Sequence, residues 1–321
     1  MALVSIVLPA YNEKENIAIA AKTLTEVLDP LPEEYELLFI SDGSRDGTYE
    51  EILRVAKDNP HVKGAEFSRN FGKEAAIFAG LELAAGDAVV VMDCDLQHPP
   101  SALPEMLEKW RDGAEVVEGI KNSRGRESLG YKLSAGLFYR IMSALIHMDM
   151  KASSDYKLLD RKAVAALLEL PERRTFFRAL SFWVGFRTER VTYDVQERVA
   201  GKSKWSMRSL IRYAVSNATS FSTAPLQAVS VMGWVFLLFA VVLGIQTLVR
   251  FCMGNAATGF TTVILLLLII GGLLLVGLGI VGHYIARIYE EVKGRPRYII
   301  RDVTDNLPEQ VKGAWKKHDQ I

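Results

Sequence analysis

Residues 88–97 read AVVVMDCDLQ, and this stretch decides the fold class. Its first half is continuously apolar and rich in β-branched side chains, which is typical of a strand buried on both faces of a parallel sheet. Two carboxylates, Asp93 and Asp95, follow directly where the apolar run stops. Because ligands bind beyond the carboxyl ends of the strands in open α/β sheets, these acids predict a binding edge.

Strand-like and helical stretches alternate along the first part of the chain. The strand-like runs are residues 3–8, 36–40, 62–67, 88–92 and 116–117. The helical patterns cover residues 14–28, 46–57 and 73–85. This order predicts an α/β fold with an open, Rossmann-like, mostly parallel sheet covered by helices. We expect residues 9–13, Asp42 and residues 93–97 to converge at its carboxyl edge.

Composition excludes several classes of protein. The chain has 321 residues, and its 38 basic side chains balance its 38 acidic ones. A net charge of zero argues against a nucleic-acid-binding protein, which needs a basic surface. Cys94 and Cys252 stand in unlike contexts, so a disulfide framework is excluded. No basic region precedes the short apolar run at residues 3–8, so we expect no secretory signal.

The C-terminal third contains a nearly uncharged segment. Between Tyr213 and Ala286 the single charged residue is Arg250. Two apolar runs within it, residues 226–249 and 260–284, are each long enough to cross a hydrocarbon core of about 30 Å. The alternative is a pair of core helices in a soluble protein, but such helices rarely need runs this long without charge. We therefore predict a two-helix transmembrane hairpin.

Basic residues flank both apolar runs and predict an orientation. They are Lys202, Lys204, Arg208 and Arg212 before the first run, and Arg287, Lys293, Arg295, Arg297 and Arg301 after the second. The positive-inside rule then predicts that both ends of the chain are cytoplasmic. The expected segments are a cytoplasmic domain (1–200), a basic, amphipathic juxtamembrane segment (201–224), two transmembrane helices (225–286) and a cytoplasmic tail (287–321).

The acid pair fits a metal-assisted reaction. Asp93 and Asp95 can hold a hard divalent cation that also binds phosphate oxygens, and Gln97 can add a neutral oxygen. A D-x-D triplet alone is common in solvated loops. Its position directly after a buried strand, on the same predicted edge as Asp42, favours a functional site.

Asp42 opens the segment DGSRDGT at residues 42–48. Part of this segment fits a glycine turn and a helix cap at Asp46 or Thr48, while Asp42 can also accept hydrogen bonds from a base or a ribose. The turn after the first strand reads PAYNEKE at residues 9–15 and lacks the glycines of a dinucleotide fingerprint. No phosphate-loop lysine motif is present either, so both of these nucleotide-binding classes are disfavoured.

Three further groups leave alternatives open. Residues 198–204 read RVAGKSK, which fits either a phosphate site at the membrane or positive-inside charge. Lys121, Arg124 and Arg126 fit a solvated surface better than a second phosphate site. Asp155 fits a base, an orienting carboxylate or a helix cap.

Three stretches together resemble glycosyltransferase family 2: SIVLPAYNE at 5–13, DGSRDGT at 42–48 and DCDLQHPP at 93–100. With residues 198–204 and the two apolar runs, the chain is similar to the polyprenyl-phosphate glycosyltransferases of that family. The resemblance implies a GT-A fold, a nucleotide-sugar donor, Mg²⁺ or Mn²⁺, and a lipid-phosphate acceptor. It also implies a homo-oligomer, a tetramer, in a bacterial cytoplasmic membrane.

The resemblance also implies roles for individual residues. The nucleotide-sugar site falls on Pro9, Tyr11, Glu13, Asp42 and Asp93, and the metal site on Asp93, Asp95 and Gln97. The acceptor-phosphate site falls on Arg198 and Lys204, to which we add Arg124 and Arg126. The expected catalytic residues are Asp95 and Asp155, the latter as a base or as an orienting group.

The expected reaction is inverting sugar transfer to a polyprenyl phosphate, with UDP-glucose and undecaprenyl phosphate as first choices. GDP-mannose, UDP-N-acetylglucosamine and a UDP-aminoarabinose derivative remain alternative donors. A processive polysaccharide synthase would need more spans and a Q-x-x-R-W motif, which the chain lacks. A nucleotide-binding membrane scaffold remains a competing class, whereas a channel is disfavoured because neither apolar run contains an acid.

Overall fold

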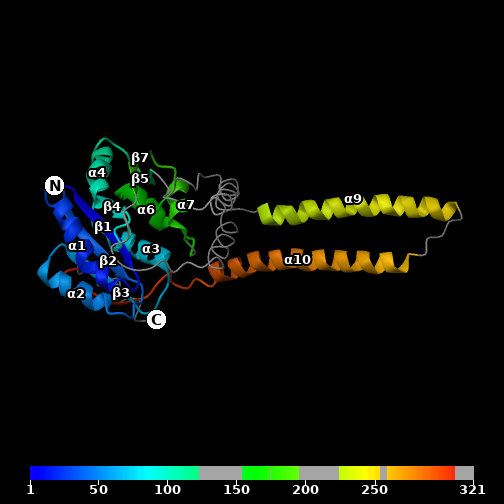
Figure 1. Ribbon diagram of the computed structural model, residues 1–321, viewed down its shortest axis with the longest axis horizontal. Helices are drawn as coiled ribbons and strands as arrows, with labels where there is room; N and C mark the ends of the chain where they lie inside the picture. Colours follow the sequence, from blue (N-terminus) through cyan, green and yellow to red (C-terminus); the bar gives the residue numbers. More distant parts are fainter. Residues whose placement is uncertain (123–153, 174, 195–223, 254–258, 308–321) are drawn as a thin grey trace. The chain divides into compact units, whose positions relative to one another are not determined.

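The computed structural model describes residues 1–122, 154–173, 175–194, 224–253 and 259–307 (Figure 1). The chain divides into two compact units, which are Met1–Lys204 with Arg295–Ile321, and Trp205–Gly294. The first unit therefore combines segments from before and after the two apolar runs.

The first unit is built on one mixed, mostly parallel sheet. In its described part the strand order is β7-β5-β6-β4-β1-β2-β3-β8. The strands are β1 (Leu3–Ala10), β2 (Glu34–Ser41), β3 (Val62–Phe67), β4 (Ala88–Val91), β5 (Val116–Lys121), β6 (Lys157–Asp160), β7 (Thr188–Tyr193) and β8 (Ile300–Val303). The strands β4, β1, β2 and β3 pair in parallel, whereas β6 and β8 pair antiparallel to their neighbours.

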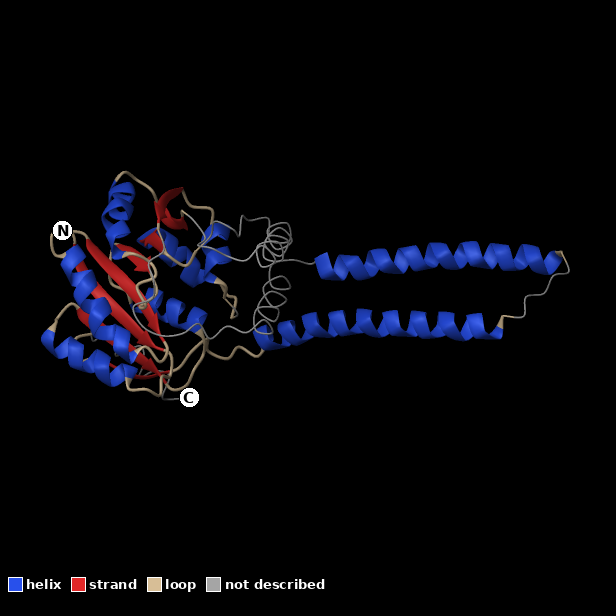
Figure 2. Cartoon of the chain, viewed as in Figure 1, coloured by secondary structure: helices blue, strands red, loops and turns tan. Residues whose placement is uncertain are grey.

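Helices connect and cover these strands, as Figure 2 shows. They are α1 (Lys14–Leu28), α2 (Thr48–Asp58), α3 (Lys73–Leu83), the short 3₁₀ helix η1 (Pro100–Ala102), α4 (Leu103–Arg111), α6 (Arg161–Glu169) and α7 (Phe177–Trp183). The predicted α/β class is confirmed, and the antiparallel strands β6 and β8 are additions that the strand pattern of the sequence did not predict.

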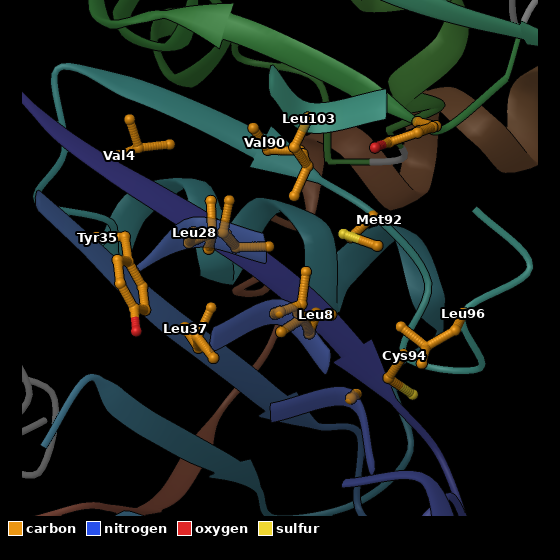
Figure 3. Packing of buried hydrophobic residues seen from close by; sticks show 14 of the residues in the cluster. Val4, Leu8, Leu28, Tyr35, Leu37, Val90, Met92, Cys94, Leu96 and Leu103 are labelled. Atoms are coloured by element: carbon orange, nitrogen blue, oxygen red, sulfur yellow. The ribbon is translucent and has the colours of Figure 1, made fainter. Parts of the chain in front are cut away.

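The strand β4 lies at the centre of the core. Its four residues are at most 1% exposed, and Val90 pairs with Ile6 of β1. Figure 3 shows Val90 among the side chains of the cluster that also holds Leu8 and Leu37. The cluster continues past the end of β4 through Cys94, which is 3% exposed. This anchor holds the Asp93–Asp95 segment against the core.

The helix α3 packs very closely against β1. A Cβ atom added at Gly80 would lie 2.1 Å from Val7 Cγ1, so only glycine permits this approach. Because Val7 and Ile6 point to opposite faces of the strand, α3 covers the face opposite to the cluster around Val90. The packing fixes the position of Lys73, the first residue of α3.

The segment after the second apolar run returns to the sheet. Ile300–Val303 forms β8 and pairs antiparallel with β3. The guanidinium of Arg297 donates hydrogen bonds to the carbonyl oxygens of Glu172 (3.0 Å) and Leu170 (2.6 Å), and Arg301 pairs with Glu66. Arg297 and Arg301, whose charges predict the membrane orientation, therefore also make structural contacts within the first unit.

The second unit contains the helices α9 (Ala224–Cys252) and α10 (Phe260–Val292). By length and composition, Leu226–Arg250 and Leu266–Val292 are each able to cross a membrane. In their most apolar stretches 0% and 6% of the residues are buried, so among the described residues no core covers them as it would cover the core helices of a soluble protein. The two helices contact each other where Gly277 faces Val229, with 3.1 Å from an added Cβ to Cγ1.

Candidate active site

Three strand ends meet at one edge of the sheet. Ala10 of β1 pairs with Ser41 of β2, and the Asp42 N–H donates a hydrogen bond to the Ala10 carbonyl oxygen at 2.9 Å. On the other side of β1, the Met92 N–H donates to the Val7 carbonyl oxygen at 3.1 Å. The residues that follow β1, β2 and β4 therefore leave the sheet along the same carboxyl edge, as predicted.

Hydrogen bonds join the loop after β1 to the loop after β2. Asn12, in the left-handed region with φ of 55°, donates its N–H to Ser44 Oγ at 3.1 Å, and its side chain accepts from the Arg45 N–H at 2.9 Å. The Glu13 N–H donates to Thr48 Oγ1 at 3.0 Å. Two of the sequence segments that carry the family resemblance thus form one bonded surface.

The predicted donor-site residues lie on this surface. Tyr11 is 43% exposed, Pro9 is half-buried near the end of β1, and Glu13 accepts a hydrogen bond from Asn16 Nδ2 at 2.5 Å. An exposed aromatic ring at a strand end can stack on a nucleobase. The exposed Tyr11 ring is therefore available for stacking at this edge.

Asp42 anchors the loop between β3 and α3. Its carboxylate accepts hydrogen bonds from the backbone N–H groups of Phe71 (2.6 Å) and Gly72 (2.9 Å). Burial raises the pKa of Asp42, although these hydrogen bonds and Arg69 oppose the effect. Beside it, a Cβ at Gly43 would lie 2.3 Å from the Arg69 carbonyl carbon, so glycine is required there. Asp42 and Gly43 together fix the 69–72 backbone against the strand end.

The acid segment after β4 has a constrained backbone. Leu96 adopts φ of 56°, which is uncommon for a bulky residue and places the neighbouring side chains at a sharp turn. Gln97 donates its N–H to Asp95 Oδ1 at 3.1 Å, and the Asp93 N–H donates to His98 Nδ1 at 3.2 Å. Burial lowers the pKa of His98, which agrees with a neutral ring that accepts this bond.

Lys73 joins the two acids for which the sequence predicted separate roles. Its Nζ lies 2.5 Å from Asp93 Oδ1 and 2.8 Å from Asp155 Oδ2. Arg178 of α7 grips Asp155 in a fork, with Nε at 2.6 Å from Oδ1 and Nη2 at 2.9 Å from Oδ2. Charged side chains from four segments of the chain therefore form one cluster at the carboxyl edge.

The cluster shifts the pKa values of its members in the directions that its charges require. Burial opposes ionisation of Asp155, but Lys73 and Arg178 outweigh it and hold the pKa of Asp155 well below its usual range. Burial likewise opposes ionisation of Asp93, and Lys73 lowers its pKa. Burial disfavours the ammonium of Lys73, but Asp155 and Asp93 raise its pKa. All three groups are therefore charged at neutral pH.

Glu74 is a further carboxyl group beside this cluster. It accepts a hydrogen bond from the Phe177 N–H at 2.8 Å, which ties the start of α7 to the start of α3. Burial and the nearby Asp155 carboxylate raise the pKa of Glu74 to about 7. The bond fixes the helix that carries Arg178.

Contacts of His98, Tyr156 and Ser154 fix the backbone around Asp93 and Asp155. The ring of His98 stacks on Tyr156 with centroids 5.0 Å apart, and the Tyr156 hydroxyl donates to the Pro99 carbonyl oxygen at 3.1 Å. Ser154 donates to the Gly119 carbonyl oxygen at 2.6 Å. Asp155 therefore stands between two buried residues that fix its backbone ahead of β6, and it does not cap a helix.

The structure brings most of the predicted site residues to one edge. Pro9, Tyr11, Glu13 and Asp42 lie on the joined loops, and Asp93, Asp95, Gln97 and Asp155 lie on the segments after β4 and before β6. The predicted phosphate-binding residues Arg124, Arg126, Arg198 and Lys204 lie outside the described residues.

Sequence reasoning missed Lys73, Glu74 and Arg178. A signal existed for the first two, because they follow Gly72 at the start of the helix after β3, on the same predicted edge as Asp42. Arg178 carries no comparable signal, since it comes from a short helix far along the chain.

Asp93 and Asp95 are too few ligands to bind a divalent cation by themselves, but they can bind one together with a substrate phosphate. Within the described residues, no group of three or more His, Cys, Asp or Glu side chains could hold a metal ion. Mg²⁺, however, is commonly bound by one or two carboxylates together with substrate phosphates. The contact between Asp93 and the Lys73 ammonium shows that a positive charge is accommodated at this carboxylate. Asp93 and Asp95, with the Gln97 amide, therefore suit a cation that a diphosphate helps to bind.

The sheet of the first unit and the helices that cover it have the GT-A fold. A structure of glucosyl-3-phosphoglycerate synthase from Mycobacterium tuberculosis, in complex with Mn²⁺, UDP and phosphoglyceric acid, has the same fold. The TM-score is 0.51 at 18% identity, over 68% of this chain and 78% of that one.

The family follows from sequence comparison. The model of Glycosyl transferase family 2 matches residues 5–168, and the chain belongs to this family. It is 39% identical over 303 residues to the bactoprenol glucosyl transferase of Shigella phage SfII, covering 93% of this chain and 97% of that protein. It is also 39% identical over 303 residues to the uncharacterized glycosyltransferase YkcC of Bacillus subtilis, covering 92% and 93%. The chain is a glycosyltransferase.

Proposed function

We propose that the enzyme transfers a sugar, with inversion, from a nucleotide-sugar to a polyprenyl phosphate at the cytoplasmic face of a bacterial membrane. UDP-glucose and undecaprenyl phosphate are the first-choice substrates. The observation that carries this proposal is the cluster of Asp93, Lys73, Asp155 and Arg178 at the sheet edge, in a chain with two helices able to span a membrane. The name of the phage relative supports the lipid acceptor and glucose, and UDP in the solved structure of similar fold supports the nucleotide.

The donor would occupy the edge formed by the loops after β1, β2 and β4. The exposed ring of Tyr11 offers a stacking face for the base, next to Pro9, Glu13 and Asp42. Asp93, Asp95 and Gln97 would hold Mg²⁺ or Mn²⁺, and such an ion supplies neutralisation of the charge that develops on the departing diphosphate. Mn²⁺ in the solved structure of similar fold supports this assignment.

The acceptor provides its own nucleophile. A phosphate monoester has a second pKa of about 6, so its oxygen is largely ionised at pH 7. This oxygen forms a bond to the anomeric carbon while the bond from that carbon to the diphosphate breaks on the opposite face. Arg124, Arg126, Arg198 and Lys204 are proposed to bind the acceptor phosphate and reduce its repulsion from the donor.

Asp155 acts in this proposal as an orienting group rather than a base. A general base works best with a pKa near the working pH, whereas Lys73 and Arg178 hold the pKa of Asp155 well below its usual range. Its fixed carboxylate instead positions two cations at the sheet edge, where the reacting anions meet.

The helices α9 and α10 would keep the enzyme at the membrane that contains its acceptor. The basic flanks of the apolar runs support cytoplasmic ends, and the polyprenyl chain can then stay in the bilayer while its phosphate reaches the active site. The proposal also includes assembly of the chain into a homotetramer, which the family resemblance implies.

The test is a transfer assay with the full-length chain in vesicles that contain undecaprenyl phosphate. Labelled UDP-glucose, GDP-mannose, UDP-N-acetylglucosamine and a UDP-aminoarabinose derivative are supplied separately with Mg²⁺ or Mn²⁺. We expect labelled lipid from one donor and none from the Asp95→Asn variant. Nucleotide binding without lipid product from any donor would instead support a membrane scaffold.

A further inference from the structure

Lys73 has two carboxylate partners of unlike character. Asp93, at 2.5 Å, is a proposed metal ligand, while Asp155, at 2.8 Å, is already held by the two-bond fork of Arg178. If Lys73 left the cluster, Asp155 would keep a cationic partner. In the part of the chain that the structure describes, Lys73 is the cation within ion-pair distance of Asp93. Asp93 is thus the carboxylate at which another cation can take the place of Lys73.

The two cations also differ in how firmly their chemistry lets a carboxylate hold them. Lysine carries a compact charge on a flexible stem, whereas the planar fork of arginine is held in one orientation by a carboxylate. The Lys73 side chain is 42% exposed and the Arg178 side chain 31% exposed, so the difference between them lies in their shape and partners. The backbone of Lys73 is fixed by the close packing of α3 on β1, so its ammonium can move between partners while its origin stays in place.

A divalent cation and the Lys73 ammonium would compete for Asp93. Like charges a few ångströms apart repel strongly in a partly buried site, so both cannot approach the same carboxylate closely. An arriving diphosphate changes this balance, because it brings new anionic oxygens that bind the metal ion and attract the displaced ammonium.

We propose that Lys73 is a positioning residue with two alternative partners: it neutralises Asp93 when no donor is bound, and it moves to the donor diphosphate when metal and nucleotide bind. This inference rests on the proposed metal-dependent function. Lys73 then weakens binding of metal alone and strengthens binding of metal with nucleotide. The enzyme thereby takes up its metal together with the donor.

Removing the Lys73 charge should change two affinities in opposite directions, which loss of a purely structural contact would not do. In Lys73→Met, which keeps the chain length and removes the charge, Mn²⁺ alone should bind about threefold tighter than to the wild type, because its competitor is gone. UDP in the presence of saturating Mn²⁺ should bind about tenfold more weakly, because a charge-assisted contact to the diphosphate is lost.

Both affinities are measured by titration calorimetry on the full-length protein, with Mn²⁺ alone and then UDP with Mn²⁺ as probes. Lys22→Met, which removes the exposed partner of Glu26 far from the edge, should leave both unchanged. Lys73→Arg should restore much of the UDP affinity, and Lys73→Gln serves as the neutral variant if Lys73→Met does not fold.

The outcomes separate this inference from the proposed function. If the neutral Lys73 variant binds Mn²⁺ alone with unchanged or weaker affinity, while the wild type binds Mn²⁺ with UDP, the two-partner role is wrong and the metal-dependent function stands. If the wild type binds no Mn²⁺ even with UDP, both proposals are wrong.

Discussion

Asp42 and Asp93 follow two buried parallel strands at the same edge of the sheet, and yet their surroundings differ. The carboxylate of Asp42 is bound by backbone N–H groups of Phe71 and Gly72, which cannot leave without unfolding a loop. The carboxylate of Asp93 is bound by the side-chain ammonium of Lys73, which a ligand can displace. Burial raises the pKa of Asp42, whereas Lys73 lowers that of Asp93. An acid at a strand end thus becomes an anchor or a ligand site according to the partner that the fold supplies.

The largest expected effect is at the proposed metal site, which contains Asp93. Asp95→Ala removes a carboxylate from the proposed metal site, and transfer should fall by at least about 10²- to 10³-fold because charge on the leaving diphosphate is no longer neutralised. The assay is labelled lipid formation in vesicles. The melting temperature should fall by only a few degrees, because the Gln97 N–H loses its acceptor, and normal turnover would remove Asp95 from the metal site.

The next largest effect is at the backbone of residues 69–72, which Asp42 and Gly43 hold against the strand end. Gly43→Ala should destabilise the protein by about 2–4 kcal/mol, because φ is positive and the new Cβ meets the backbone of Arg69 at 2.3 Å. Gly72→Ala is the matched control, since Gly72 also has positive φ but a Cβ there meets nothing within 4 Å. Its cost should be about 1–3 kcal/mol, because φ of 100° and ψ of 156° lie in a region that is essentially restricted to glycine. Equal losses in denaturant unfolding would show that close approach to residue 69 is unimportant.

The opposite pKa shifts predict opposite pH dependences. The lowered pKa of Asp93 means that its ionised form stabilises the fold above the usual carboxyl range near about 3.9, and that this contribution is lost as pH falls. The raised pKa of Asp42 means that its contribution is complete at low pH and is lost as pH rises through that pKa.

Melting temperatures of the wild type, Asp93→Asn and Asp42→Asn between pH 3.5 and 8 measure these slopes. The advantage of the wild type over Asp93→Asn should grow as pH rises from the acid end, whereas its advantage over Asp42→Asn should shrink. A tenfold difference in proton affinity between the folded and unfolded chain corresponds to about 1.4 kcal/mol of stability. Slopes of the same sign would contradict the distinction between the two carboxylates.

The smallest effect concerns the contact between the first two loops. Ser44→Ala removes the acceptor of the Asn12 N–H and should cost about 0.5–1.5 kcal/mol, with a modest rise in the KM for the nucleotide-sugar. Denaturant unfolding and donor kinetics measure the two changes. Lys22→Ala, on an exposed ion pair, should change stability by less than about 0.5 kcal/mol and leave KM unchanged.

Part of the site was predictable because it follows from local pattern. The apolar residues of β4 predicted a buried strand, and the carboxyl-end rule then placed Asp93 on the same edge of the sheet as Asp42 without coordinates. The contacts of Asp155 were not predictable, because Lys73 is 82 residues away and Arg178 is 23 residues away on a helix with no motif. Strand β8 was missed for a similar reason, since four residues after a long apolar helix have too short a pattern to identify.

The sequence by itself determined the alternation of strands and helices, the acid pair at the end of β4 and the two long apolar helices. Each depends on the periodicity or composition of a continuous stretch, which acts within one element. Only the tertiary structure decided that Asp42 binds backbone amides, that Lys73 bridges Asp93 and Asp155, and that Arg178 fixes the latter. Such partners are chosen by packing between distant segments, and the free energy of a charge depends on which neighbours that packing supplies.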